Sequence, residues 1–393
     1  MIFATFTCVL ALAAPQSSGD GATGAEDPRQ TLANAPALSA TQGRGARDRA
    51  VRWLLDNQRE DGSWAEGVMD SVQETFFSVE SFYAWKLAAD SLACLALASV
   101  EETPEIRAAL ERGVTFLLDA RLAQRGSDWD TDYGWSTLYG FVALTELYGD
   151  ARFQGEEWAG RIEAKAKAYL DLLERLQSPQ GGWAYYDDPI FSQRPTWDTS
   201  FCTALVLPSL KRAIELGWLE DEGVLERGRR YVIRCAVPAG AYAYDIAGAR
   251  RGWSGESINR IKGSLGRTQV CNWALRETGS EKITEQRIRE GLESFLEHHR
   301  FLDVARLRPI PHEAYYANAG YFYMFGHYYA AQAVELLPIE EREGWHARLR
   351  PHLVRAQQRD GSALDFITSS YDRVACTAYL VLGLTLGLEG GSR

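Results

Sequence analysis

The sequence predicts an all-α protein built as a single α6/α6 toroid of six helical hairpins. Segments with one charged and one apolar face alternate along the chain with segments that are apolar on nearly every side, and both show the spacing of helices. A helix without a polar face is buried all round, so we expect the apolar helices to form an inner ring within the charged ones. The sequence lacks the sustained alternation of period two that would indicate strands.

The N-terminal residues are expected to lie outside this toroid. Residues 1–14 form an apolar run of secretory length, and Ala11-Leu12-Ala13 offers a cleavage site between small residues. Residues 15–45 are rich in Ala, Gly, Ser, Pro and Gln, a composition typical of a disordered linker. The sequence thus predicts a signal peptide at 1–14, a linker at 15–45 and the toroid at 46–393. The protein is then secreted or periplasmic, or cytoplasmic if the apolar run is not a leader.

Six units of similar length fill residues 46–393. Each unit carries an aromatic or bulky residue near the end of its charged helix, five positions before a glutamine or the residue that aligns with it. A fixed period of this kind indicates a repeat architecture, in which one hairpin cannot bury its apolar helix alone. The six positions are Trp53, Phe116, Leu172, Tyr231, Phe295 and His352, spaced 63, 56, 59, 64 and 57 residues apart.

The pattern Gln-x-x-x-Gly-x-Trp follows the charged helix of the first and third units, and a shortened copy follows that of the sixth. Glutamine can hydrogen-bond the orphan groups of a helix end, and glycine permits the chain to reverse there. Tryptophan adds a large apolar face beneath the loop. We therefore predict that these segments are clasps between adjacent hairpins, and not an active site. They are Gln58–Trp64, Gln177–Trp183 and Gln357–Ala363.

The clasps and the helices before them resemble the repeats of the prenyltransferase and squalene-cyclase family. The resemblance covers residues 46–393 and implies an α/α toroid with an aromatic-lined central cavity, similar to terpene cyclases but reduced to one barrel. Gln177, Gly181 and Trp183 supply a second complete repeat tail. The first unit meets the full repeat pattern with Arg49, Ala50, Trp53, Leu54, Gln58, Gly62 and Trp64.

Carboxylates gather in the segment DWDTD at residues 128–132, just before the apolar helix of the second unit. Class II terpene cyclases protonate an alkene with an Asp-x-Asp-Asp motif, so the resemblance implies Asp130 as the acid. Asp128, Asp132 and Asp198 are then its electrostatic partners. Neither frame of the segment completes the motif, and the same carboxylates suit capping of the following helix. Both interpretations stay open from the sequence.

Aromatic residues crowd the expected cavity-facing ends of the inner helices. Their faces can stabilise a carbocation along an isoprenoid chain, stack on sugar rings, or fill a core. The fifth unit adds further tyrosines at Tyr315, Tyr321 and Tyr328. The predicted ligand-binding set is Tyr133, Trp135, Tyr139, Trp197, Phe201, Tyr316, Tyr323 and His327.

The sequence implies no cofactor and does not favour a metal. Protein prenyltransferases, the other branch of the resemblance, bind zinc with an Asp-x-Cys pair and a later histidine. The corresponding positions here are Gln269, Cys271 and His327, and Gln269 replaces the aspartate. Cys271 and His327 alone fall short of the three protein ligands that a zinc site needs.

Net charge and hydropathy limit the classes of partner that the protein is expected to bind. The net charge of -11 argues against nucleic acid, and no segment after the leader is long and apolar enough to span a membrane. One basic patch, at residues 250–256 with Arg260, Lys262 and Arg267, suits either a diphosphate or acidic sugar or a solvated loop.

Three functions remain open from the sequence. The leading hypothesis is a terpene cyclase-like protein that holds an apolar ligand, such as an isoprenoid, in its central cavity. The first alternative is a secreted polysaccharide lyase or hydrolase that uses the same carboxylates with Arg251, Arg260 or His327. The second is a non-catalytic scaffold or binding protein.

Overall fold

The computed structural model describes residues 36–70, 74–75, 77–127, 129–185, 197–250, 257–366 and 369–388. The predicted signal peptide and residues 15–35 of the predicted linker lie outside this part of the chain. Within it, no helix is both long and apolar enough to cross a membrane. Five cysteines in this part of the chain are buried and have free thiols: Cys94, Cys202, Cys235, Cys271 and Cys376.

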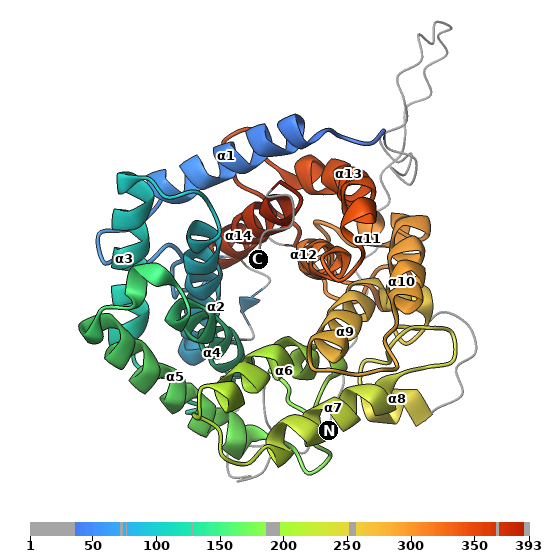
Figure 1. Cartoon of the computed structure of the whole chain (residues 1–393), viewed down its shortest axis with the longest axis horizontal. Coiled ribbons are helices and arrows are strands. Elements are labelled where there is room, and N and C mark those ends of the chain that lie inside the picture. The colour runs from blue at the N-terminus through green and yellow to red at the C-terminus, as the bar shows by residue number, and fades with distance from the viewer. Residues whose placement is uncertain are drawn as a thin grey trace, which may run out of the picture. The chain divides into compact units, whose positions relative to one another are not determined.

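Two concentric rings of helices make up the fold (Figure 1). The predicted all-α toroid of six helical hairpins is confirmed. The outer helices are α1 (Ala40–Asp56), α3 (Pro104–Asp119), α5 (Glu156–Leu176), α7 (Gly223–Cys235), α10 (Glu285–Glu297) and α13 (Ile339–Ala356). The inner helices are α2 (Val79–Ala98), α4 (Gly134–Tyr148), α6 (Ser200–Glu215), α9 (Leu265–Glu277), α12 (Phe322–Val334) and α14 (Ser370–Leu386). Short helices α8 (Ile246–Arg250) and α11 (Arg300–Ala305) lie in the connections.

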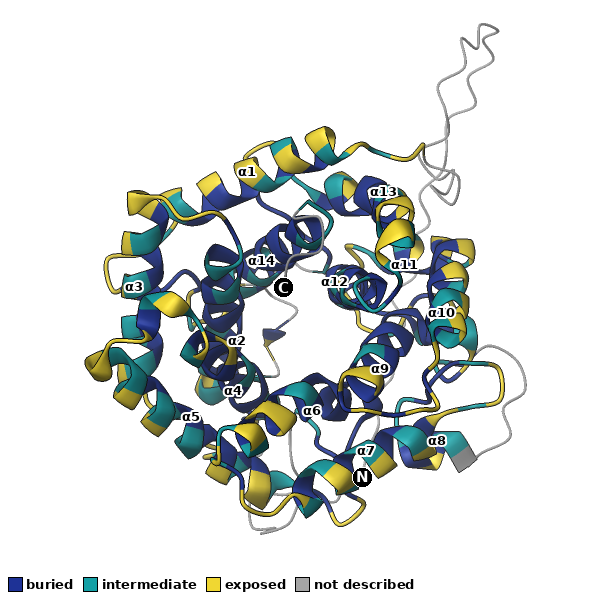
Figure 2. Ribbon diagram, viewed as in Figure 1, coloured by how far each residue is buried: buried dark blue, intermediate teal, exposed yellow. Residues whose placement is uncertain are grey.

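The burial of each ring follows from its residue pattern. Figure 2 shows the inner helices buried over most of their surface, whereas the outer helices are exposed on the face that points away from the centre. The last inner helix, α14, packs against the first, α2, so the ring is closed. Burial of the apolar helices on all sides requires this closure, because an open row of hairpins would leave two of them uncovered.

The glutamines of the three predicted clasps make the same contacts. Gln58 Nε2 donates to the carbonyl oxygen of Gly62 in its own loop, at 3.0 Å, and to that of Ala109 in the next outer helix, at 2.8 Å. Gln177 and Gln357 repeat the pair of bonds, within their own loops and to Val224 and Ala46. Each glutamine therefore ties one hairpin to the next outer helix, and Gln357 ties the sixth unit back to the first.

Glycine and tryptophan complete each clasp. Gly181 has a φ of 100°, in the region that favours glycine, and a Cβ there would lie 2.6 Å from the carbonyl oxygen of Arg227. Trp183 is buried beneath the loop, and its indole N–H donates to the Leu173 carbonyl oxygen at 2.7 Å. Trp64 makes the matching bond in the first unit. The clasps thus fix the fold, and none of their residues lines the two cavities at the ends of the inner ring.

Helix α1 begins at Ala40, earlier than the expected toroid boundary at residue 46. The Ser39 hydroxyl accepts from the Gln42 amide, and the Gln42 side chain accepts from the Ser39 amide. This capping box satisfies two of the orphan donors at the helix start and extends the helix into a segment whose composition resembles a linker.

Both ends of the described ring meet at one buried side chain. Arg350 of α13 donates from Nη1 to the carbonyl oxygen of Leu38, at 3.1 Å, and from Nη2 to that of Gly387, at 2.7 Å. The same two nitrogens pair with Glu343. The residues before α1 and after α14 are therefore held side by side.

Candidate functional site

The loops that lead into the inner helices bring polar and aromatic side chains together at one end of the inner ring. Asp132 precedes α4, Tyr185 and Trp197 precede α6, Tyr244 precedes α9, and Tyr321 precedes α12. Because each repeat delivers its loop to the same end, residues far apart in the sequence meet there. Tyr185, Tyr244 and Tyr321 are termed the tyrosine cluster below.

Asp130 is a buried carboxylate that orders its own loop. It accepts from the Ser127 hydroxyl at 2.9 Å, from the Gly126 amide at 3.0 Å and from the hydroxyl of Ser78 at the start of α2. Burial acts to raise the pKa of Asp130, but these hydrogen bonds outweigh it and the pKa is lowered. Asp130 is therefore ionised at neutral pH, and its contacts are those of a capping group.

Asp132 differs from Asp130 in that its pKa is raised and not lowered. Its backbone φ is 66°, a left-handed conformation that aspartate tolerates better than most residues. The residue as a whole is half-buried, but its carboxyl is withdrawn from solvent, and this raises the pKa to about 7. The hydrogen bond from the Trp85 side chain offsets only part of that rise. The carboxyl also interacts electrostatically with Tyr185 and Tyr321. A substantial fraction of Asp132 is therefore protonated at neutral pH.

An aromatic wall stands beside Asp132. Trp135 stacks on Tyr185, with ring centroids 5.3 Å apart and planes inclined by 4°. Tyr139 stacks on the same tryptophan at 5.8 Å, and Phe201 lies 6.1 Å from it. Trp197 meets Tyr185 edge to face at 5.0 Å. Four members of the predicted ligand-binding set, Trp135, Tyr139, Trp197 and Phe201, are thus gathered in one place.

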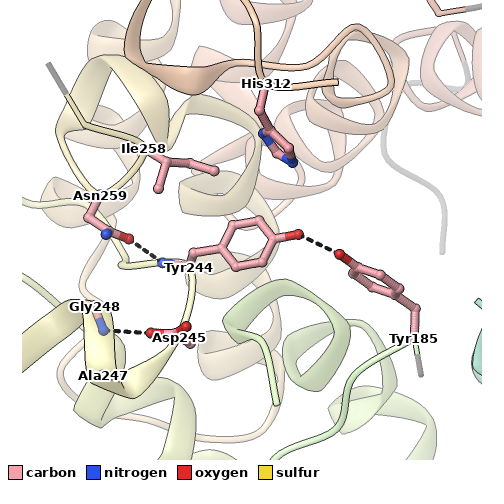
Figure 3. A pocket seen from close by; sticks show the side chains of 8 residues that line it. All are labelled: Tyr185, Tyr244, Asp245, Ala247, Gly248, Ile258, Asn259 and His312. Carbon is pink, nitrogen blue, oxygen red and sulfur yellow. Dashed lines mark hydrogen bonds between the residues drawn. The ribbon is translucent and has the colours of Figure 1, made fainter. Parts of the chain in front are cut away.

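A cavity of about 400 Å³ is lined in part by Tyr185 of this wall (Figure 3). The hydroxyls of Tyr185 and Tyr244 are hydrogen-bonded at 3.0 Å, and the Asn259 side chain accepts from the Tyr244 amide at 2.6 Å. The cavity is therefore lined by hydroxyl, amide and carboxyl groups against aromatic faces. Its lining residues are Tyr185, Tyr244, Asp245, Ala247, Gly248, Ile258, Asn259 and His312.

His312 and Tyr321 form a base and acid pair at the edge of this cavity. The His312 Nδ1 lies 2.7 Å from the carbonyl oxygen of Ala317, which can only accept, so Nδ1 carries the proton of the neutral ring. Nε2 is then an acceptor for the Tyr321 hydroxyl, 2.8 Å away. Burial lowers the pKa of His312, so the ring is neutral at pH 7 and Nε2 is available as a base.

Arg267 lies behind the cavity and is only 1% exposed. Its guanidinium stands over the rings of Tyr244 and Phe322, at 5.2 and 5.4 Å from the ring centroids. Nη2 donates to the Ile258 carbonyl oxygen, whereas Nε and Nη1 have no hydrogen-bond partner in the described structure. Burial lowers the pKa of Arg267 to about 10, so it stays cationic and polarises the tyrosine cluster.

A larger cavity of about 770 Å³ occupies the opposite half of the inner ring. All six inner helices contribute to it, with apolar side chains such as Leu92, Leu382 and Trp273 and with charged groups such as Arg212 and Glu277. Tyr139 lines this cavity and also stacks on Trp135. Tyr139 therefore connects the larger cavity with the aromatic wall beside Asp132.

The remaining predicted site residues lie elsewhere. Asp198 accepts from Ser178 within the third-unit clasp, and Tyr133 packs against Ala84 and Ala123. Tyr316 meets Phe301 edge to face, at a centroid distance of 4.9 Å. Asp128 lies outside the described residues, as do residues 251–256 of the basic patch.

The zinc pair that the resemblance suggested is not assembled. The Cys271 thiol lies 3.8 Å from the Ser200 carbonyl oxygen, whereas the ligand atoms grouped with His327 belong to His299 and His352. Tyr323 lies in the same wall of helices, where its hydroxyl donates to the His352 carbonyl oxygen at 3.0 Å. His327 and Tyr323 therefore lie against the outer helix α13 and line neither of the two cavities.

Sequence reasoning missed Tyr185 and Tyr244, although the repeat contained a signal for them. Gly240 has a φ of 89° and corresponds to Gly181 of the third-unit clasp. With these glycines aligned, Tyr185 and Tyr244 each stand four residues later, at the same place in consecutive units. The fourth clasp was hidden because Ala236 replaces the glutamine and Tyr242 replaces the tryptophan.

Comparison with known proteins supports the fold. No family model and no curated protein matches the sequence. The structure is similar to that of the type II terpene cyclase MstE from Scytonema, with a TM-score of 0.50 at 16% identity over 88% of this chain and 98% of that one. A polysaccharide lyase gives 0.51 at 11% identity, over 88% and 97%. An inactive α-1,6-mannanase variant from Salegentibacter sp., in complex with α-1,6-mannotetrose, gives 0.53 at 12%, over 88% and 99%. The chain is thus similar in fold to α/α toroid proteins of several activities, and its function depends on the chemistry of its own residues.

Proposed function

We propose that this protein is an acid–base enzyme of the terpene-cyclase type, which holds an isoprenoid ligand against the aromatic wall and uses Asp132 as the proton donor. The observation that carries this proposal is the position of Asp132, whose carboxyl interacts with Tyr185 of the aromatic wall and with Tyr321. Withdrawal from solvent there raises the pKa of the carboxyl to about 7. An ordinary surface carboxyl is ionised at neutral pH and has no proton to give. Asp130, the acid that the resemblance implied, is instead kept ionised by its hydrogen bonds.

In the proposed reaction the Asp132 carboxyl transfers its proton to a terminal epoxide oxygen or alkene carbon of the ligand. The C–O or π bond breaks, and positive charge develops on the adjoining carbon, where the faces of Trp135 and Tyr185 stabilise it. An internal double bond then supplies the electron pair for the new C–C bond. The reaction ends when Tyr321 takes up a carbon-bound proton while its own proton passes to His312 Nε2. His312 then releases this proton to solvent, and Asp132 regains one from solvent.

The acidity of Asp132 favours an oxygen atom as the first proton acceptor. Proton transfer becomes slower as the acid becomes weaker relative to the group it protonates. A carboxyl of pKa about 7 is a weak donor for an isolated alkene, whereas an epoxide oxygen carries lone pairs and strain that favour opening. The apolar side chains of the larger cavity offer room for the rest of an isoprenoid chain beyond Tyr139.

A substrate comparison tests the proposal. Geranylgeranyl dihydroxybenzoate, the substrate named for a variant of the terpene cyclase MstE, and its terminal epoxide are incubated separately with the purified protein. Cyclisation leaves the mass unchanged and alters the retention time in liquid chromatography with mass spectrometry. We expect the epoxide to be converted faster than the alkene. Recovery of both compounds unchanged and unbound would contradict the proposal.

A polysaccharide lyase is the second candidate, and the His312–Tyr321 pair favours it. β-Elimination needs a base for a carbon-bound proton, an acid for the leaving oxygen and a cation beside the sugar carboxylate, and His312, Tyr321 and Arg267 are of these types. In a screen of uronate-containing oligosaccharides, a lyase would release unsaturated sugars that absorb in the ultraviolet. A lyase would also lose activity when Tyr321 is replaced by phenylalanine and keep it when Asp132 is replaced by asparagine. The cyclase proposal requires the reverse for its first proton transfer, which depends on Asp132.

The pH dependence of turnover follows from the Asp132 pKa. A general acid works in its protonated form, so the rate should be highest below pH 7 and fall as the pH rises through about 7. Initial rates measured between pH 5 and pH 9 check this, and the same profile for Asp132→Asn separates the Asp132 titration from that of His312. A rate that instead rises with pH on the acid side of pH 7, where a histidine of lowered pKa loses its proton, would assign the essential group as a base and favour His312.

A further inference from the structure

Three buried histidines lie between the inner and outer rings, and none of them contacts the aromatic wall or the tyrosine cluster in the contacts described above. His299 precedes α11, His327 lies in α12 and His352 in α13. Their exposed fractions are 0%, 0% and 2%. One ring nitrogen of each lies within 4.8 Å of those of the other two. Nothing in the proposed reaction uses these side chains.

The hydrogen bonds of His327 and His299 leave two nitrogens facing each other. His327 Nδ1 lies 2.7 Å from the Tyr323 carbonyl oxygen, so it carries the ring proton and Nε2 is bare. His299 Nδ1 lies 3.0 Å from a carboxylate oxygen of Asp303, which fixes the same tautomer when Asp303 is ionised. The two Nε2 atoms are 2.9 Å apart. Two facing lone pairs repel at this distance unless a positive centre lies between or beside them.

A proton or a metal ion can supply that centre, and His352 distinguishes them. A proton shared between the two Nε2 atoms would satisfy His299 and His327, provided that a neutral Asp303 donates its own proton to His299 Nδ1. It would leave His352 Nδ1 unsatisfied, because this nitrogen is buried and has no hydrogen-bond partner within the described chain. A metal ion satisfies all three rings. Burial lowers the pKa of His299 and His352 to about 3, so the imidazoles are neutral and their lone pairs are available.

We propose that His299, His327 and His352 form a binding site for a divalent transition-metal ion, with Zn²⁺ as the ion best suited to three imidazoles. Asp303 and the Tyr323 carbonyl oxygen orient two of the rings through their Nδ1 atoms, as outer partners of metal-bound histidines commonly do. Burial raises the pKa of Asp303, whereas the nearby cations Arg306 and Arg355 favour its ionised form, and a bound metal ion would favour that form further. The ion links α11, α12 and α13, so its role is to hold the fifth unit to the sixth.

Metal analysis of the full-length protein tests this site. Protein purified without chelators or metal-affinity resin should contain about one equivalent of zinc by inductively coupled plasma mass spectrometry. His327→Gln and His352→Gln should lose it, and Asp303→Asn should weaken binding by roughly 10- to 100-fold. His346→Gln is the matched control, because His346 is also buried and on α13 but bonds to Glu335 at 2.7 Å, outside the cluster. It should retain the metal.

A second measurement covers variants that fail to fold. Wild-type protein is unfolded in a chelator, refolded with Co²⁺ or without metal, and examined by visible absorption and thermal melting. Cobalt bands and a Tm higher than that of the metal-free sample would support the site. Refolded wild-type protein that binds neither Co²⁺ nor Zn²⁺ would overturn it, as would zinc retained by folded His327→Gln and His352→Gln.

Discussion

Replacing Asp132 by asparagine is expected to lower kcat by about 10²- to 10⁴-fold, the usual contribution of a general acid. The amide keeps the size of the carboxyl and can still accept from Trp85, but it has no proton to transfer at neutral pH. Ligand binding should change little, because the aromatic wall is intact. The check is the single-turnover rate on the epoxide substrate, together with retention of that ligand in native mass spectrometry.

Asp90→Asn is the matched control for that substitution. Asp90 is also a buried carboxyl whose pKa burial raises to about 7, but it accepts from the amides of Trp64 and Ala65 in the first clasp. Asparagine can accept the same two bonds, so we expect turnover close to wild type. Equal loss of activity in both variants would show that removing a buried carboxyl harms the fold in general, and would remove the case for Asp132 as the acid.

Replacing Gly361 by alanine is expected to lower the free energy of unfolding by about 3–5 kcal/mol, as backbone strain and overpacking add. The φ of Gly361 is 97°, and a Cβ there would lie 2.6 Å from the carbonyl oxygen of Arg49. Neither atom belongs to a flexible side chain that can move aside. Since this clasp joins the sixth unit to α1, the strain acts on closure of the ring. Urea unfolding followed by circular dichroism measures the loss.

Gly160→Ala is the matched control, because the same substitution is expected to raise the free energy of unfolding at this position. Gly160 is exposed in the second turn of α5, and no atom lies within 4 Å of a Cβ built there. Alanine is the better helix former, so we expect an increase in stability of about 0.5–1 kcal/mol. If Gly361→Ala were as stable as wild type, Gly361 would not require its left-handed conformation and the clasp would not control ring closure.

The fold was predictable because its determinants repeat. The spacing of Gln58, Gly62 and Trp64 describes a complete local device, and a second copy at Gln177 shows that the device belongs to the architecture. The glutamine reaches the next outer helix in every copy, so one pattern encodes both a helix end and a contact between units. Apolar faces on all sides of alternate helices then required an inner ring.

The candidate site was predictable only to the level of a segment. DWDTD indicated where carboxylates gather, but Asp130 and Asp132 differ through contacts that no local pattern contains. Ser78, which precedes α2, holds Asp130 ionised, whereas burial among rings from other units raises the pKa of Asp132. His299 and His352 were not predicted as neighbours of His327 for the same reason. The contact of the three rings depends on packing between two units and not on any sequence spacing.

Arg350 has a consequence for how the chain can be cut and rejoined. Because it binds the carbonyl oxygens of Leu38 and Gly387 together, a short linker between these two residues would join the ends of the ring with little change in structure. New termini could then be opened between α9 and α10 or between α12 and α13, at the end of the inner ring opposite Asp132. A circularly permuted protein of this kind would keep all six hairpins in the same places in the ring. Synthesis would, however, begin with a different unit.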